Sequence, residues 1–171
     1  ALSNNTTASY NTAIGAQSQY ETTTGASNVS IGNVSLKENT TGYDNVAAGN
    51  NALRVNTTGH GNTAVGRMSL YANTSGVTNT ALGRSAGYDL TTGDNNMCLG
   101  YLSGTSSSPS GSLTTSYNTI CLGDNNISNL YCNDTSISSS DSRDKTDVAD
   151  FTHGLNWVNQ LNPVTYRWDK R

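Results

Sequence analysis

Small apolar residues and polar residues alternate along the chain in a pattern that returns every 17 residues between residues 9 and 130. The clearest unit of this pattern is a pentamer that ends in glycine. Its first six copies are NTAIG, NVSIG, NVAAG, NTAVG, NTALG and NMCLG, which close at Gly15, Gly32, Gly49, Gly66, Gly83 and Gly100. A seventh copy, TICLG, closes at Gly123, 23 residues after the sixth. A fixed period of this kind is typical of a chain wound into stacked coils.

The alternation inside each pentamer predicts a short strand. Its second and fourth residues are mostly the larger ones, and they share one face of the strand. The residue between them is always small: Ala13, Ser30, Ala47, Ala64, Ala81, Cys98 and Cys121. A second strand is predicted around Leu36, Leu53 and Leu70, and the Thr-Thr-Gly segments predict turns. We therefore expect two short strands and two turns in each coil.

The predicted fold is all-β, a repetitive β-solenoid or β-roll followed by a small α+β C-terminal segment. Extended over its full length, one 17-residue repeat reaches only about 56 Å, which leaves a thin interior for about three medium apolar side chains. So little burial does not offset the entropy lost when each repeat becomes ordered. We therefore predict an oligomer, a homotrimeric fibre whose chains approach each other through the column of small residues.

The composition narrows the range of functions. Charged residues make up 12% of the chain and aromatic residues 7%, which fits either a disordered chain or a repetitive β-structure. The regular period excludes disorder for residues 9–130. A net charge of −3 argues against non-specific nucleic-acid binding, and no apolar run approaches the roughly 18 residues that a membrane span needs. We expect neither a nucleic-acid partner nor membrane insertion.

The chemical character of the chain changes at residues 138–145, SSSDSRDK. Of the 21 charged residues, 10 lie in residues 140–171, together with the one Phe and both Trp. This concentration predicts a separate folded piece, so we divide the chain into residues 1–139 and 140–171. Leu155, Val158 and Leu161 stand at helical spacing in the second piece, and Pro163 ends the predicted helix.

Two sets of motifs resemble known families. The NTAxG and NTTG repeats are similar to those of trimeric phage tail fibres and, more loosely, of trimeric autotransporter adhesin heads. SDSRDK, followed by TDV and GLNWVNQLNPVTYRW, resembles the start of the self-cleaving intramolecular chaperone domain of endosialidase-type tailspikes. Ser140, Asp141, Arg143 and Lys145 fall in the register of that family. Asp144 departs from it, because the family usually has an apolar residue there, and the 31 residues after Ser140 are fewer than in the family's domain.

The second resemblance implies a specific reaction. Ser140 is the nucleophile and Lys145 is its general base, and Ser140 attacks the carbonyl carbon of Ser139 to release residues 1–139. Lysine can act as a base only when it is neutral, which requires burial or a neighbouring cation to lower its pKa. The alternative interpretation of SDSRDK is a solvated polar linker.

Together the resemblances imply the distal part of a tailed-phage fibre, made in the host cytoplasm and then carried extracellularly on the virion. Its expected partners are two further copies of the chain, other tail proteins and a host receptor that is a glycan or a protein. The candidate receptor-binding surfaces are the loop 101–117, where the period is broken, and exposed tyrosines, of which Tyr88, Tyr101 and Tyr117 are the candidate receptor-binding residues. Tyrosine suits contacts with sugars and proteins, although it also packs well in strands.

Three other functions share features with this sequence but fit it less well. A bacterial trimeric adhesin shares such repeats but should end in a coiled coil and a membrane anchor. An ice-binding solenoid should repeat Thr-x-Thr regularly, whereas only a single column recurs, at Thr40, Thr57, Thr74 and Thr91. A glycan-cleaving tailspike needs paired carboxylates in a cleft, and the acidic residues of the repeats are few and scattered.

No cofactor or metal site is expected. The three cysteines form no CxxC motif, and His60 and His153 lie in unrelated parts of the sequence. Cys98 and Cys121 share a column in successive coils, which allows a disulfide but favours two buried free thiols. Cys132 has no visible partner.

Overall fold

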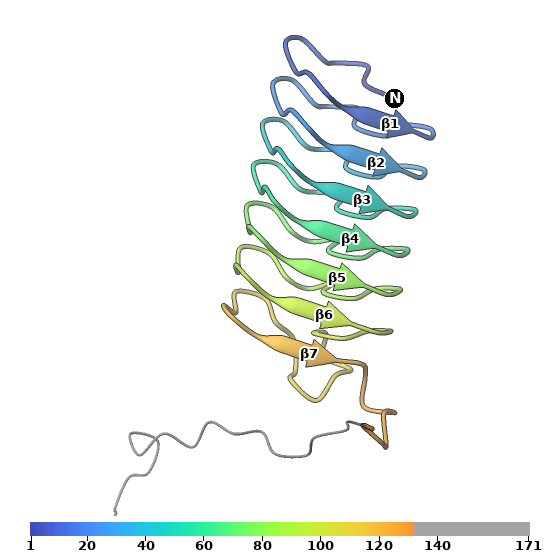
Figure 1. The fold of residues 1–171 in the computed structure, drawn as a ribbon, viewed down its shortest axis with the longest axis vertical. Coiled ribbons are helices and arrows are strands. Elements are labelled where there is room, and N and C mark those ends of the chain that lie inside the picture. The colour runs from blue at the N-terminus through green and yellow to red at the C-terminus, as the bar shows by residue number, and fades with distance from the viewer. Residues whose placement is uncertain (132–171) are drawn as a thin grey trace, which may run out of the picture. The chain divides into compact units, whose positions relative to one another are not determined.

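The computed structural model describes residues 1–131, which form a β-solenoid with seven stacked coils (Figure 1). Each coil contributes one three-residue strand, and the strands lie in chain order in one parallel sheet. They are β1 (Thr12–Ile14), β2 (Val29–Ile31), β3 (Val46–Ala48), β4 (Thr63–Val65), β5 (Thr80–Leu82), β6 (Met97–Leu99) and β7 (Ile120–Leu122). The all-β solenoid predicted from the repeats is confirmed.

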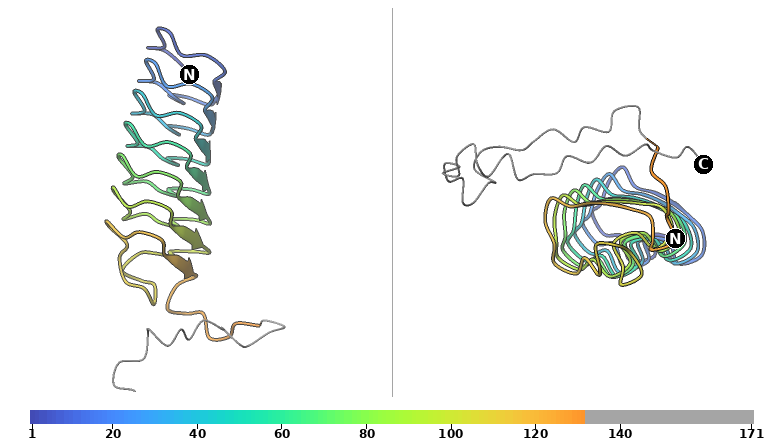
Figure 2. Two further views of the ribbon diagram at one scale, coloured as in Figure 1. Left: turned by 60° about the vertical axis from the view of Figure 1, so that its left-hand side comes forward. Right: turned by 90° about the horizontal axis from the view of Figure 1, so that it is seen from below.

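The register of the sheet follows the repeat. Thr12 pairs with Val29, and each later residue pairs in the same way with the residue one repeat further on. The longer step between the last two strands does not disturb this pairing, because Cys98 still pairs with Cys121. The extra residues form a loop between β6 and β7, and the coils overlie one another when seen along the stack (Figure 2).

The predicted second strand is wrong. In the part of the chain that the structure describes, Leu36, Leu53 and Leu70 lie in turns, with φ angles of 49°, 47° and 46°. Strands require negative φ, so these leucines cannot belong to one. Their backbone N–H groups still donate to the next coil, as Leu53 does to the Ser69 carbonyl at 3.0 Å. The leucine side chain thus points inward although the backbone around it turns.

The column of small residues lies inside the coil, which corrects the expectation that neighbouring chains meet through it. Ala47, Ala64 and Ala81 are completely buried, whereas the larger residues on either side of them in the strands face outward. In the coils of β2, β3 and β4 a completely buried leucine, at Leu36, Leu53 or Leu70, also occupies the interior, so only a small strand side chain fits beside it. The core of a middle coil is therefore one leucine and one or two small residues, rather than the three medium apolar side chains expected.

Much of the remaining interior is polar, which the sequence did not reveal. A ladder of completely or almost completely buried asparagines precedes the strands at Asn28, Asn45, Asn62, Asn79 and Asn96. Each side-chain carbonyl accepts a hydrogen bond from the backbone N–H of the next asparagine, or in the last case from that of Thr119. Each side-chain amide donates to a glycine carbonyl, or in the last case to that of Ser116. These contacts satisfy buried polar groups that would otherwise destabilise the fold.

Replacement of Asn62 by Ala should lower the free energy of unfolding by about 3 kcal/mol, because it removes the partners of two buried backbone groups. The Asn62 amide donates to the Gly76 carbonyl at 2.8 Å, and its carbonyl accepts from the Asn79 N–H at 2.9 Å. Asn50→Ala is the control, since Asn50 is exposed and should change stability by less than about 0.5 kcal/mol. Urea denaturation followed by circular dichroism measures both. If both variants lost the same free energy of unfolding, the buried asparagine ladder would not be what stabilises the coils.

Candidate functional site

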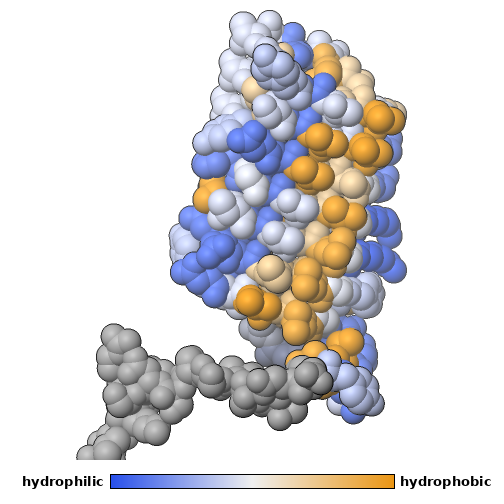
Figure 3. Space-filling model, in the orientation of Figure 1, coloured by the Kyte–Doolittle hydropathy of each residue, from blue (hydrophilic) through white to orange (hydrophobic). Residues whose placement is uncertain are grey.

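The outward side of the sheet is largely apolar. We call it the outer sheet face and define it as the first and third residues of strands β1 to β7. Its most exposed apolar members include Ile14, Ile31, Val46, Leu82, Met97, Ile120 and Leu122. Figure 3 shows the resulting hydrophobic strip along the stack. A long exposed apolar patch of this kind marks an interaction surface.

A shallow cavity of about 210 Å³ interrupts the outer sheet face near its last strands. Thr80, Met97 and Ile120 line it from the strands, and Thr78 and Asn118 line it from the segments that lead into them. Since its lining is a mixture of methyl groups and amides, it is an uneven part of the same face rather than a separate polar site.

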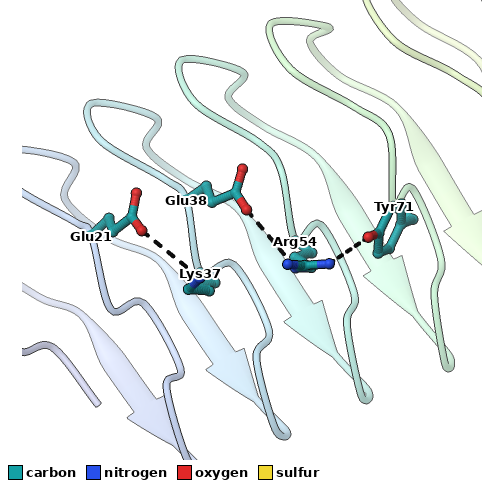
Figure 4. Close-up of polar contacts among 5 residues, drawn as sticks. All are labelled: Glu21, Lys37, Glu38, Arg54 and Tyr71. Carbon is teal, nitrogen blue, oxygen red and sulfur yellow. Dashed lines mark hydrogen bonds and ion pairs between the residues drawn. The ribbon is translucent and has the colours of Figure 1, made fainter.

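A row of partly exposed side chains runs along the coils on the turn that carries the leucines (Figure 4). Glu21 pairs with Lys37 and Glu38 pairs with Arg54, each at 3.9 Å between charged atoms. Such exposed ion pairs stabilise a protein only weakly. The Arg54 guanidinium also donates to the Tyr71 hydroxyl at 2.5 Å. The row is therefore a stack of flat and charged groups, repeated at the spacing of the coils.

The three candidate receptor-binding tyrosines lie at different positions of their coils. Tyr88 is half-buried and continues the row, with its ring stacked on that of Tyr71 at 5.0 Å between centroids. Tyr101 is exposed, and the Arg84 guanidinium lies 5.5 Å from the centre of its ring. Tyr117 is also exposed and precedes β7. Tyr88 also lines a cavity together with polar residues that the sequence analysis did not name, among them Asp89 and Ser107.

The two described cysteines are buried free thiols, as the sequence favoured. Burial raises the pKa of the Cys98 thiol to about 12, with a smaller contribution from the neighbouring Cys121. Cys121 accepts a hydrogen bond from the Gly104 N–H at 3.0 Å. Because the thiolate is the reactive form, Cys98 should be inert toward alkylating reagents at neutral pH.

The described part of the chain, residues 1–131, holds no candidate metal site. No group of three or more His, Cys, Asp or Glu side chains in this range could hold a metal ion. His60 is instead stacked on Tyr43, with 4.4 Å between ring centroids. A search of these residues found no helix with the length and apolarity to cross a membrane.

Comparison with known families concerns the remainder of the chain. Residues 140–171 match the family described as chaperone of endosialidase. The resemblance seen in SDSRDK and the segment after it is thereby confirmed at the level of the family. No curated protein and no solved structure shows significant similarity to the chain.

The residues predicted to cleave the chain fall in or next to the segment that matches this family. Ser139, Ser140 and Lys145 lie outside the described residues, as do Cys132 and the helix predicted around Leu155. The family match covers Ser140 and Lys145, but their roles as nucleophile and base stay predictions.

Sequence reasoning missed two features of the described surface. It assigned intermolecular contacts to the small residues, although the larger residues beside them in each strand were visible in the same pentamers. It also named Tyr88 without Asp89 and Ser107, which line the same cavity from two different coils. No sequence signal links these two residues, because the loop between β6 and β7 does not follow the repeat.

Proposed function

We propose that this chain is the distal part of a trimeric phage tail fibre that recognises a host receptor. Its C-terminal chaperone segment assists folding of the trimer and is released by cleavage before Ser140. The observation that carries the proposal is the combination of a thin β-solenoid over residues 1–131 with a chaperone-of-endosialidase match over residues 140–171. A chaperone that is discarded after folding suits a repetitive fibre, whose coils can pair in more than one register.

The outer sheet face supports an oligomer. A middle coil buries one leucine within itself, while residues such as Leu82 leave about half of their surface in water. Covering this face would add apolar burial along the whole stack, where the isolated coil has little. A cyclic assembly around an axis parallel to the stack brings the same face of every copy together. It also keeps all chaperone segments at the same end, and the number three follows the resemblance to trimeric fibres.

A charged residue on the outer sheet face should prevent assembly. Leu82→Asp places a carboxylate in each copy of the proposed interface, where it has no partner and is costly to bury. We expect wild type to sediment as a trimer and this variant as a monomer, with unchanged circular dichroism because residue 82 is exposed in the single chain. Thr24→Asp, an exposed substitution outside the strands, should leave the trimer intact. A monomeric wild type, or a trimeric Leu82→Asp, would refute this interface.

Receptor recognition is tested by attachment to cells. Fluorescently labelled protein is incubated with a panel of bacterial strains that differ in their surface polysaccharides, and bound fluorescence is measured at increasing concentration. The proposal expects saturable binding to a subset of strains, which excess unlabelled protein abolishes. Binding that does not saturate on any strain would contradict it.

A further inference from the structure

The stacked row of side chains ends at Tyr88. The next position in the row, 17 residues on, is Thr105, a buried residue whose hydroxyl donates to the Leu102 carbonyl at 2.6 Å. Tyr71, in the preceding coil, covers one face of the Tyr88 ring, with only 10° between the two ring planes. Tyr88 also lines an open cavity of about 220 Å³, together with Leu102 and Thr105 of the following coil. The cavity lies where another ring would continue the stack.

Polar groups surround this cavity, which we call the Tyr88 cavity. Ser85 and Asp89 line it from the coil of Tyr88, and Ser106 and Ser107 line it from the loop between β6 and β7. One oxygen of the Asp89 carboxylate accepts a hydrogen bond from the Ser112 hydroxyl at 2.7 Å. Within residues 1–131, the other oxygen and the three serine hydroxyls make no hydrogen bond. They are therefore available to a ligand.

The loop that supplies two of these serines is held in place by its own backbone. The Ser108 N–H donates to the Thr105 carbonyl at 3.0 Å, and the Asn125 N–H donates to the Ser107 carbonyl at 2.8 Å. The Thr105 hydroxyl accepts from the Ser107 N–H at 3.2 Å. Because these contacts hold the loop backbone, the backbone does not have to be ordered when a ligand binds, which favours affinity.

We propose that the Tyr88 cavity binds one neutral pyranose ring of a cell-surface glycan. The apolar face of a pyranose can lie on the tyrosine ring, while its hydroxyls donate to the Asp89 carboxylate and exchange hydrogen bonds with the serines. The volume suits a single ring rather than an oligosaccharide. This inference rests on the proposed function and deepens it, since it names the receptor as a glycan.

The charge of the cavity selects among sugars. Asp89 forms no ion pair within residues 1–131, so no cation in this range pairs with its negative charge. An acidic sugar such as N-acetylneuraminic acid or glucuronic acid would place a second carboxylate beside it and be repelled. The cavity also stays accessible in the proposed trimer, because none of its lining residues belongs to strands β1 to β7.

The experiment is saturation-transfer NMR on the intact protein. The ligands are the methyl glycosides of glucose, galactose and mannose and of N-acetylglucosamine, with the two acidic sugars for comparison. We expect at least one neutral glycoside to bind wild type with a Kd of about 1 mM, which corresponds to a single small subsite. Neither acidic sugar should bind as tightly.

Variants assign the binding to the cavity. Tyr88→Ala should abolish the signal, and Asp89→Asn should weaken binding about fivefold or more, because a charged acceptor forms stronger hydrogen bonds. Asp89→Asn does not touch the stacked rings, so it tests the site without disturbing the coil. Tyr10→Ala, an exposed tyrosine of the first coil, is the matched control and should bind like wild type.

The outcomes separate this inference from the proposed function. Saturable attachment to cells with no bound neutral sugar would overturn the sugar site and leave receptor recognition standing. Sugar binding that Tyr88→Ala abolishes and Asp89→Asn weakens, without attachment to any strain, would support the site and contradict the proposed receptor function. Stronger binding of an acidic sugar, or neutral-sugar binding that neither substitution weakens, would overturn the inference.

Discussion

Replacement of Ser140 by Ala should leave the protein uncut, whereas the wild-type protein, expressed from its complete reading frame, should yield a product that ends at Ser139. Alanine has no hydroxyl to attack the carbonyl carbon, and a serine-lysine pair has no other nucleophile to replace it. The expected effect is therefore complete loss of cleavage, the largest of any prediction here. Intact-mass spectrometry of the purified proteins measures it directly.

Two further variants make this result specific. Lys145→Arg should also remain uncut, because arginine stays protonated and cannot accept the proton of Ser140. Ser142→Ala is the matched control, since it removes a serine hydroxyl from the same SDSRDK segment and should be cleaved like wild type. A cleaved Ser140→Ala protein would exclude Ser140 as the nucleophile. If the wild type also stays intact, residues 140–171 are a retained segment and the release step of the proposed function is wrong.

Replacement of Gly66 by Ala should lower the free energy of unfolding by about 4 kcal/mol, the largest stability change we predict. Gly66 has a φ of 130°, a conformation that side chains rarely adopt. A Cβ atom there would lie 2.5 Å from the carbonyl oxygen of Gly83 and 2.6 Å from its carbonyl carbon. Both atoms belong to the backbone of the next coil, so relief of the clash requires the coils to separate.

Gly61→Ala is the control for this prediction. Gly61 also has positive φ, at 65°, but the nearest atom to its added Cβ is the Thr78 methyl group at an ordinary 3.5 Å. The same position in other coils holds Ser27, Asp44 and Thr78 at φ between 54° and 57°. We therefore expect a loss of about 1 kcal/mol for Gly61→Ala. Urea denaturation of both variants measures the difference. If both lost a similar free energy of unfolding, the close contact between coils would not explain the need for glycine at position 66.

The sequence by itself determined the coil and its period. In a stacked coil each residue meets its counterpart in the next repeat, so a regular spacing along the chain becomes a regular pairing in space. Val29 pairs with Val46, for example, at the distance of one repeat. The alternation within NTAxG was likewise enough to locate every strand, and SDSRDK with the following segment was enough to recognise the chaperone family.

Only the tertiary structure decided which side of each strand is the interior. Alternation shows that Ala64 and Val65 point in opposite directions, but it does not show which of them is buried. The width of the coil decides this, because Leu70 and its counterparts already occupy the space across from the strands. The leucines were misassigned to a strand for a related reason: an inward side chain can be placed by a turn as well as by a strand.

The polar interior and the Tyr88 cavity were also beyond the sequence. Asn62 is buried because neighbouring coils supply a partner for its amide and carbonyl, and composition alone predicts an exposed residue. Asp89 and Ser107 line one cavity because the loop between β6 and β7 lies beside the coil of Tyr88. The repeat in the sequence determined the features that recur from coil to coil, namely the strands and their pairing. Which residues are buried depends on packing across the coil, and the Tyr88 cavity depends on a loop outside the repeat.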